Sequence, residues 1–169
     1  MIKVRDTTGK ILFEERQRFP QWLFLLMIMP LLVTIASFAA TGILSDERTG
    51  IWIVFPLVIL LQVVVMYYFR ITRFEKIVSE TGLYFRWMPL QKKYRFIPRE
   101  DIEGFRMRRG PVLKLGSGYY IGLGRYHTVS TGIGVHVFLN HGKKIFFGTD
   151  EQIFFQRAME KIAKTIELT

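Results

Sequence analysis

Residues 22–44 read WLFLLMIMPLLVTIASFAATGIL, and no charged side chain interrupts them. At about 1.5 Å per residue, a helix over this stretch would reach roughly 34 Å, enough to cross a hydrocarbon core of about 30 Å. A second uncharged stretch, residues 51–69, reads IWIVFPLVILLQVVVMYYF. Since only residues 45–50 separate the two, the sequence predicts an antiparallel transmembrane hairpin. We expect its helices over 21–44 and 51–70, with a short external loop over 45–50.

Two alternatives to a transmembrane hairpin are disfavoured. A cleaved signal peptide has a shorter apolar core, and it would not be followed at once by a second apolar stretch. Two buried helices of a soluble protein are a weak alternative, because no polar face interrupts either stretch. Lysine and arginine flank the outer ends of the pair, whereas the connector holds only Arg48 beside Asp46 and Glu47. The positive-inside rule therefore places both termini in the cytoplasm, with the protein integral to the cell (inner) membrane.

One polar pair is expected inside the hairpin. Gln62 is the only amide in the second stretch, and folding the chain about the connector brings Thr34 to a similar depth. An amide in hydrocarbon needs a hydrogen-bond partner. We therefore predict an interhelical hydrogen bond between Thr34 and Gln62.

Composition separates the chain into an apolar part and a basic part. Hydrophobic residues make up 50% of the chain, yet its formal net charge is +10, and most of that charge follows the second apolar stretch. The chain has no cysteine, which excludes disulfides and thiolate metal sites.

Residues 71–169 have a sequence pattern typical of a small, mainly-β domain. Short alternating segments separated by turn signals predict about seven antiparallel strands, over residues 72–78, 82–87, 92–97, 102–109, 119–123, 134–139 and 143–147. A C-terminal amphipathic helix follows, with Ile153, Phe154, Ala158, Ile162 and Ile166 on its apolar face. This is a PH-like (pleckstrin-homology-like) arrangement. Residues 1–20 form a cytoplasmic segment that is either a β-hairpin joining the sheet or a lipid-facing tail.

A family resemblance points the same way. The segment 97–116, IPREDIEGFRMRRGPVLKLG, resembles one found in bacterial PH-like membrane proteins. Residues 126–149 are similar to the last strands of a related, uncharacterised bacterial family that also carries two N-terminal transmembrane helices. The resemblance implies the fold and a membrane context. Its motifs are structural turns, so it supplies no catalytic residues.

Basic clusters are the candidate binding residues. Three clusters follow the second apolar stretch: Lys92, Lys93 and Arg95; Arg106, Arg108 and Arg109; Lys143 and Lys144. They indicate a surface for a protein partner, for a second copy of the chain or, alternatively, for the acidic lipids of the membrane. The predicted function is accordingly a membrane-anchored, non-enzymatic binding or scaffold module. Neither nucleic acid nor a small-molecule substrate is expected as a ligand.

No constellation predicts catalysis, a cofactor or a metal. His127, His136 and His141 have no carboxylate spacing that would complete a metal site. The glycine-rich stretch 115–126, LGSGYYIGLGRY, matches no phosphate-binding motif and is not followed by a helix. We expect Gly116 and Gly118 to form a turn, and Gly122 and Gly124 to relieve a strand where it bends or is closely approached. Arg125 is expected to contact a ligand only as part of the basic surface.

Overall fold

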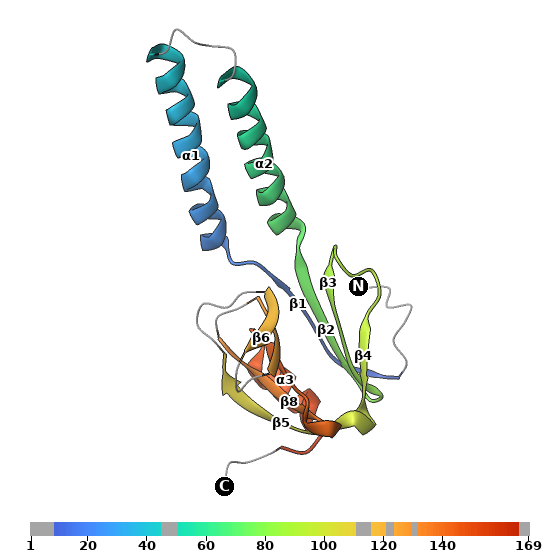
Figure 1. Cartoon of the computed structure of the whole chain (residues 1–169). Coiled ribbons are helices and arrows are strands. Elements are labelled where there is room, and N and C mark those ends of the chain that lie inside the picture. Colours follow the sequence, from blue (N-terminus) through green and yellow to red (C-terminus); the bar gives the residue numbers. More distant parts are fainter. Residues whose placement is uncertain (1–8, 45–50, 111–115, 121–123, 130–131, 166–169) are drawn as a thin grey trace. The chain divides into compact units, whose positions relative to one another are not determined.

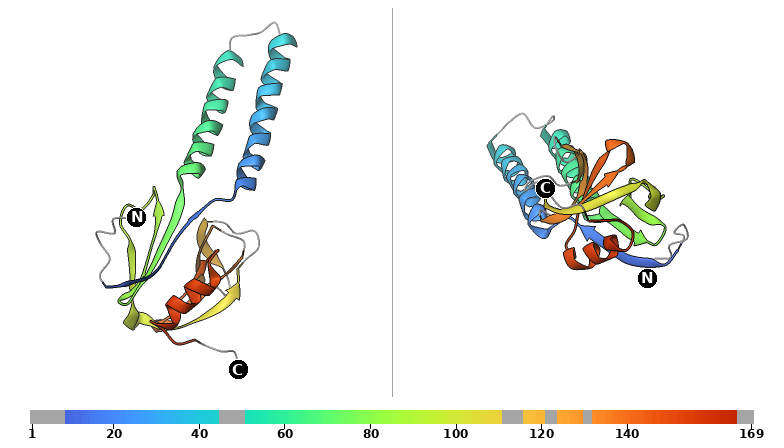
Figure 2. Two further views of the ribbon diagram at one scale, coloured as in Figure 1. Left: turned by 180° about the vertical axis from the view of Figure 1, so that it is seen from behind. Right: turned by 90° about the horizontal axis from the view of Figure 1, so that it is seen from below.

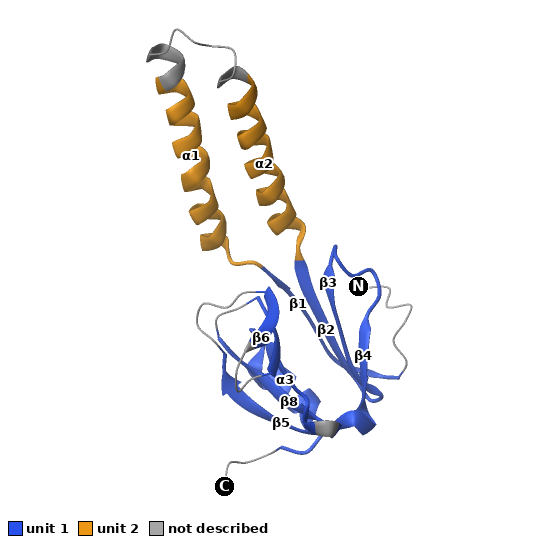
Figure 3. Ribbon diagram, in the orientation of Figure 1, with its two compact units in different colours: residues 1–18, 73–169 blue, residues 19–72 orange. Residues whose placement is uncertain are grey.

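The computed structural model describes residues 9–44, 51–110, 116–120, 124–129 and 132–165, and these form two compact units. One unit is the pair of helices, residues 19–72. The other is a β domain made of residues 1–18 and 73–169 (Figures 1 and 3). The domain is therefore discontinuous in sequence, because the helices are inserted between its first two strands.

The helical unit is an antiparallel hairpin. Helices α1 (Gln21–Leu44) and α2 (Ile51–Ile71) pack against each other, with Phe38 and Phe55 ring centroids 5.0 Å apart. Gln62 Nε2 donates to Thr34 Oγ1 over 3.0 Å, so the structure contains the hydrogen bond expected between these two residues. Both helices are long and apolar enough to cross a membrane, and most of their large apolar side chains are exposed.

The first sheet is a four-stranded antiparallel meander in the order β1-β2-β3-β4. Its strands are β1 (Ile11–Arg18), β2 (Arg73–Ser79), β3 (Gly82–Met88) and β4 (Arg95–Pro98). Arg18 pairs with Arg73, and Arg73 pairs with Met88, so these residues form the last row of the sheet. Of the two alternatives for residues 1–20, the structure shows a single strand at Ile11–Arg18 that joins the sheet, and residues 1–8 lie outside the described part.

The second sheet has five strands in the order β5-β8-β9-β7-β6. They are β5 (Ile102–Arg109), β6 (Gly116–Tyr120), β7 (Gly124–Thr128), β8 (Ile133–Leu139) and β9 (Lys144–Gly148). Two short 3-10 helices, η1 (Arg99–Asp101) and η2 (Asn140–Gly142), connect strands. Within the two sheets, four pairs of consecutive strands form antiparallel hairpins: β2 with β3, β3 with β4, β6 with β7, and β8 with β9. Strands β7 and β9, in contrast, pair in parallel.

The core lies between the two sheets. Phe74, Phe85, Phe105, Val137 and Phe147 are buried there, and the Phe85 and Phe147 rings lie 5.1 Å apart. Helix α3 (Gln152–Glu160) contacts β1, β2 and β8 and so bridges the sheets (Figure 2). The chain after α3 then runs beside β5, where Phe105 N donates to Lys164 O.

Several sequence predictions need correction. The described residues contain nine strands rather than about seven, because β1 joins the sheet and β7 forms where a bend was expected. The strand expected at 119–123 is β6, which begins at Gly116, so Gly116 and Gly118 lie in a strand rather than in a turn. Residues 121–123 lie outside the described part. The expectation that all strands are antiparallel is wrong for β7 and β9.

The apolar face of α3 also differs from the prediction. Phe155, Ala158, Met159 and Ile162 are buried, whereas Ile153 and Phe154 are 64% and 61% exposed. The rotation of the helix about its axis is determined by Phe155, whose ring stacks on that of Phe13 with the two ring centroids 5.2 Å apart. Placing Phe155 inward rotates Phe154 toward solvent. Ile166 lies outside the described residues.

Candidate functional site: a basic pocket at the end of the core

A row of side chains that crosses the second sheet changes from apolar to basic. Cross-strand pairing aligns Phe105 on β5, Val137 on β8, Ile145 on β9, Arg125 on β7 and Tyr119 on β6. Residues directly opposite each other share a face of the sheet. Phe105 and Val137 are fully buried in the core, Ile145 is half-buried, and Arg125 and Tyr119 are exposed. The basic end of this row lies where the core between the sheets opens to solvent.

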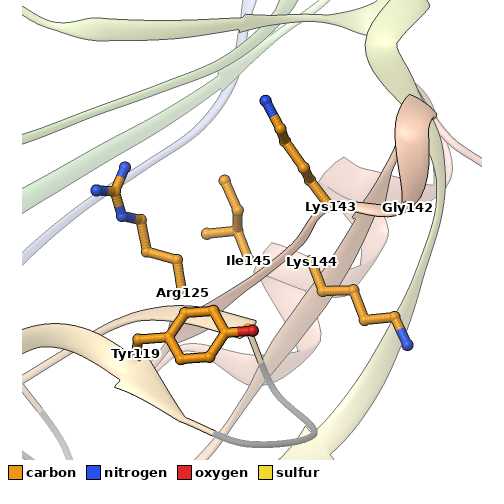
Figure 4. Close-up of a pocket in the computed structure, with 7 residues that line it drawn as sticks. Tyr119, Arg125, Gly142, Lys143, Lys144 and Ile145 are labelled. Carbon is orange, nitrogen blue, oxygen red and sulfur yellow. The ribbon is translucent and has the colours of Figure 1, made fainter.

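A cavity of about 600 Å³ lies at this end of the row, lined by Tyr119, Gly124, Arg125, Gly142, Lys143, Lys144 and Ile145. Arg125 and Lys143 extend toward the same side, with Ile145 between them and the Tyr119 ring below (Figure 4). Lys144 extends away from this space, and its Nζ lies 5.6 Å from the Phe138 ring centroid. Arg125 and Lys143 therefore supply the positive charge inside the pocket.

These two cations differ from the arginines of the first sheet in their ion pairing. Arg16, Arg73 and Arg86, on the first sheet, all lie within 4 Å of a Glu75 oxygen. In contrast, no carboxylate in the described part of the chain lines the pocket or forms an ion pair with Arg125 or Lys143. Uncompensated charge in a concave surface raises the local positive potential and attracts anions. The geometry thus fits an anionic group rather than a neutral one.

Two glycines make the pocket possible. Gly124 opens β7 with φ +72°, and a Cβ there would collide with the Lys144 carbonyl on the neighbouring strand. Gly142 also has φ +72° and ends the turn before β9, where Leu139 N donates to Lys143 O over 2.8 Å. Left-handed backbone is nearly free of strain only for glycine. The close approach at Gly124 is the one expected from the sequence.

The remaining basic residues predicted as a binding surface are not gathered at the pocket. Arg106 is half-buried and Arg108 and Arg109 are exposed on β5, at the opposite edge of the sheet from β6. Lys92, Lys93 and Arg95 are exposed on the first sheet, around the β3–β4 connection. Of the predicted clusters, only Lys143 and Lys144 line the pocket. Sequence reasoning gave Arg125 a minor role and missed Tyr119, because it did not predict the parallel pairing of β7 with β9.

A second polar cluster is buried and joins the two sheets. Lys76 is fully buried and its Nζ lies 2.9 Å from Glu15 Oε2, directly across β1 and β2. Lys76 also donates to the Gly148 carbonyl. The Glu15 carboxylate accepts hydrogen bonds from Thr149 Oγ1 at 2.5 Å, from Asp150 N at 2.9 Å and from Gln17 Nε2 at 2.8 Å. Burial lowers the pKa of Lys76 to about 8, an effect that Glu15 opposes. This cluster fixes the β9–α3 connection onto the first sheet.

The histidines lie apart. His127 and His136 pair with Phe147 and Phe146, which are consecutive on β9, so the two imidazoles point to opposite faces of the sheet. His127 Nδ1 accepts a hydrogen bond from Trp87 Nε1 at 3.2 Å, and burial lowers its pKa to about 4. The side chain of His141 lies outside the described part. Among the described residues, no three His, Cys, Asp or Glu side chains gather in a way that could hold a metal ion.

Comparisons with protein-family models, with curated proteins and with solved structures found no match for this chain. The chain is therefore described by its architecture. Two long apolar helices near the N-terminus form a hairpin, and a β-rich domain with a C-terminal helix carries a basic pocket at one end of its core.

Proposed function

We propose that the protein is a membrane-anchored, non-enzymatic binding module. Its β domain lies on the cytoplasmic face of the membrane and holds an acidic segment of a protein partner, or of a second copy, in the pocket between Tyr119, Arg125 and Lys143. The observation that carries the proposal is the pairing of Arg125 and Lys143 in a cavity of about 600 Å³ that no carboxylate of the described residues lines.

The strand pairing supports the membrane topology. β1 precedes α1, β2 follows α2, and the two strands pair from Ile11 with Ser79 to Arg18 with Arg73. Strands can pair only if they lie on the same side of a membrane, so two helices between them that cross it would have to do so in opposite directions. The hydrogen bond between Thr34 and Gln62 provides a partner for the amide in hydrocarbon. Arg16, Arg18, Arg70 and Arg73 flank the hairpin and favour the cytoplasmic side.

The β domain supports a PH-like assignment. A four-stranded antiparallel meander packs on a second sheet whose strands β5, β8 and β9 form another antiparallel meander, and a C-terminal helix bridges the two. Relative to a PH-like arrangement, two features of this chain would be insertions. The helical hairpin is inserted between β1 and β2, and the β6–β7 hairpin, which builds the pocket, is inserted between β5 and β8.

The chemistry of the pocket favours recognition of carboxylates. Arg125 presents a planar guanidinium that can bind a carboxylate with two parallel hydrogen bonds, and Lys143 adds a second cation on the same side. Tyr119 adds an exposed aromatic surface and a hydroxyl, and Ile145 adds an apolar contact between the two cations. Together they suit a short acidic segment that includes one apolar side chain.

The test uses the full chain in nanodiscs of neutral lipid and a fluorescent peptide of alternating glutamate and leucine. Charge-assisted hydrogen bonds contribute about 1.5–3 kcal/mol each, so we expect Arg125→Ala with Lys143→Ala to weaken binding by about tenfold or more. The matched control is Arg108→Ala with Arg109→Ala, which removes the same charge at the opposite edge of the sheet. Equal weakening by both pairs would show that net charge alone binds the peptide and would refute the pocket.

The anionic-lipid alternative predicts a different result. The wild-type chain would then bind the peptide poorly in every nanodisc, and Arg125→Ala would instead weaken association of the detergent-solubilised chain with anionic vesicles but not with neutral ones. Self-association of the chain that excess acidic peptide disrupts would identify a second copy as the partner.

A further inference from the structure

The connection between β3 and β4 presents an exposed apolar tip flanked by lysines. Leu90 is 71% exposed, Pro89 is exposed beside it, and Lys92 and Lys93 follow with exposed side chains. The base of the tip is held by hydrogen bonds: Gln91 N donates to Trp87 O at 2.6 Å, and Arg86 Nη1 donates to Lys92 O at 3.1 Å. The fold therefore holds the backbone of the tip in place while its apolar side chain faces outward.

Strand register places this tip at the end of the sheet where the chain arrives from α2. Met88 pairs with Arg73, the first residue of β2, and only Thr72 separates Arg73 from the end of α2 at Ile71. Because β2 and β3 are antiparallel, the last residue of β3, Met88, lies at the same end of the sheet as the first residue of β2, Arg73. From Ile71 through Arg73 and Met88 to Leu90, the path spans at most roughly 19 Å.

The side chains around the tip match a membrane surface. Arg18 and Arg73 lie in the same row of the sheet as Met88, at the end of the sheet that carries the tip. The headgroup layer is roughly 5–8 Å thick on each side of the hydrocarbon. An apolar residue can enter this layer while lysine ammonium groups remain at the level of the phosphates, which attract them.

We propose that residues 89–93 insert into the headgroup layer of the leaflet at which α2 ends, and that they prefer anionic lipid. Leu90 supplies the apolar contact, and Lys92 and Lys93 bind lipid phosphates. This proposal rests on the membrane location of α1 and α2 but not on the ligand of the basic pocket. If residues 89–93 insert in this way, the β domain is anchored to the bilayer by the two helices and, in addition, by this tip.

The experiment uses single-cysteine variants of the full chain, which has no native cysteine. Leu90→Cys carries an environment-sensitive fluorophore, in proteoliposomes of neutral lipid with or without phosphatidylglycerol. The aqueous control is Ile153→Cys, a similarly exposed apolar position on α3, and the membrane control is Leu61→Cys on α2. We expect blue-shifted emission and several-fold stronger quenching by lipid-borne quenchers at position 90 than at position 153.

Charge reversal tests the lipid preference. Lys92→Glu with Lys93→Glu is expected to remove the blue shift at position 90, whereas Arg108→Glu with Arg109→Glu is expected to leave it. The proposal is overturned if the label at position 90 is as aqueous as that at position 153, or if position 90 becomes protected only when other proteins are added. An aqueous label at position 61 would instead refute the membrane location itself.

Discussion

Glu15 and Lys76 face each other across β1 and β2 with both side chains buried, and 2.9 Å separates Oε2 from Nζ. The pair is not symmetric in its other partners. Glu15 accepts three further hydrogen bonds, from Thr149, Asp150 and Gln17, whereas the described partners of Lys76 besides Glu15 are the Gly148 carbonyl and the Phe155 ring, at 4.5 Å. Removing the charge of Glu15 and removing the charge of Lys76 should therefore lower the free energy of unfolding by different amounts.

We expect Glu15→Gln to lower the free energy of unfolding by about 3–5 kcal/mol, because it leaves a buried ammonium without its counter-ion. Lys76→Met should be less damaging, since the carboxylate keeps its three donors. The double variant should recover part of the loss. Denaturant titration of the detergent-solubilised chain measures these values, with Arg16→Met, an exposed ion-pair position, as the control. A loss for Glu15→Gln no greater than that for Arg16→Met would contradict the prediction.

His127 makes stability depend on pH. Its pKa is about 4 in the folded protein and about 6.5 when unfolded, so between these values the unfolded chain binds a proton that the folded chain does not. Stability is therefore fully present above pH 6.5 and falls as the pH drops toward 4. Between pH 7 and pH 5 the loss should be about 2 kcal/mol.

The measurement compares the pH slope of wild type with that of His127→Phe. The variant removes the hydrogen bond from the Trp87 indole to His127 and so is less stable at pH 7, but it should lack the His127 contribution to the slope. Identical slopes would mean that His127 is not held neutral in the folded state.

Gly124 should be the most sensitive glycine of the pocket. Gly124→Ala forces a side chain into left-handed backbone and against the Lys144 carbonyl, so we expect a loss of at least about 1–3 kcal/mol and weaker binding of acidic peptide. Gly132→Ala is the control, because a Cβ there would meet nothing within 4 Å. Thermal unfolding and peptide binding report the two effects, and equal tolerance of both substitutions would rule out the close contact between β7 and β9.

Within the hairpin, Thr34→Val should destabilise more than Gln62→Leu. The first leaves the Gln62 amide without its partner in hydrocarbon, whereas the second removes the polar group altogether. Such hydrogen bonds contribute about 0.6–2 kcal/mol in membranes, so the difference should be about 1 kcal/mol. Unfolding of the hairpin by sodium dodecyl sulfate in mixed micelles measures it. The reverse order would show that the bond does not form.

The discontinuity of the β domain predicts how to isolate it. Replacing residues 19–72 by Asn-Gly should join Arg18 to Arg73 through a two-residue turn and yield a soluble, folded domain. A fragment beginning at Arg73 should not fold, because it lacks β1 and leaves Lys76 without Glu15. Dispersion of amide signals in NMR spectra distinguishes the two outcomes, and a well-folded fragment without β1 would contradict the prediction.

The sequence predicted the helices almost to the residue because uninterrupted apolar stretches depend only on local composition. It also located β2, β3, β5, β8 and β9, whose residues alternate and whose ends carry turn signals. It left β1 ambiguous, since the partner of β1 follows the whole hairpin. It missed the parallel pairing of β7 with β9 and the burial of Glu15 and Lys76, because both depend on contacts between distant segments. The pocket combines Arg125 with Lys143 through that same pairing, so only the lysine cluster could be found from the sequence.

The pairing of Arg18 with Arg73 has a consequence for biosynthesis. A ribosome makes β1 before the two helices and β2 after them. Under the proposed membrane topology, the first sheet can close only if both helices cross the bilayer. If a single helix were inserted, β1 and β2 would be stranded on opposite sides of the membrane, and the sheet, the buried ion pair and the pocket would all fail to form. Under that topology, folding of the β domain would depend on correct membrane insertion, and a misinserted chain would expose unpaired strands to the quality-control proteases of the cell.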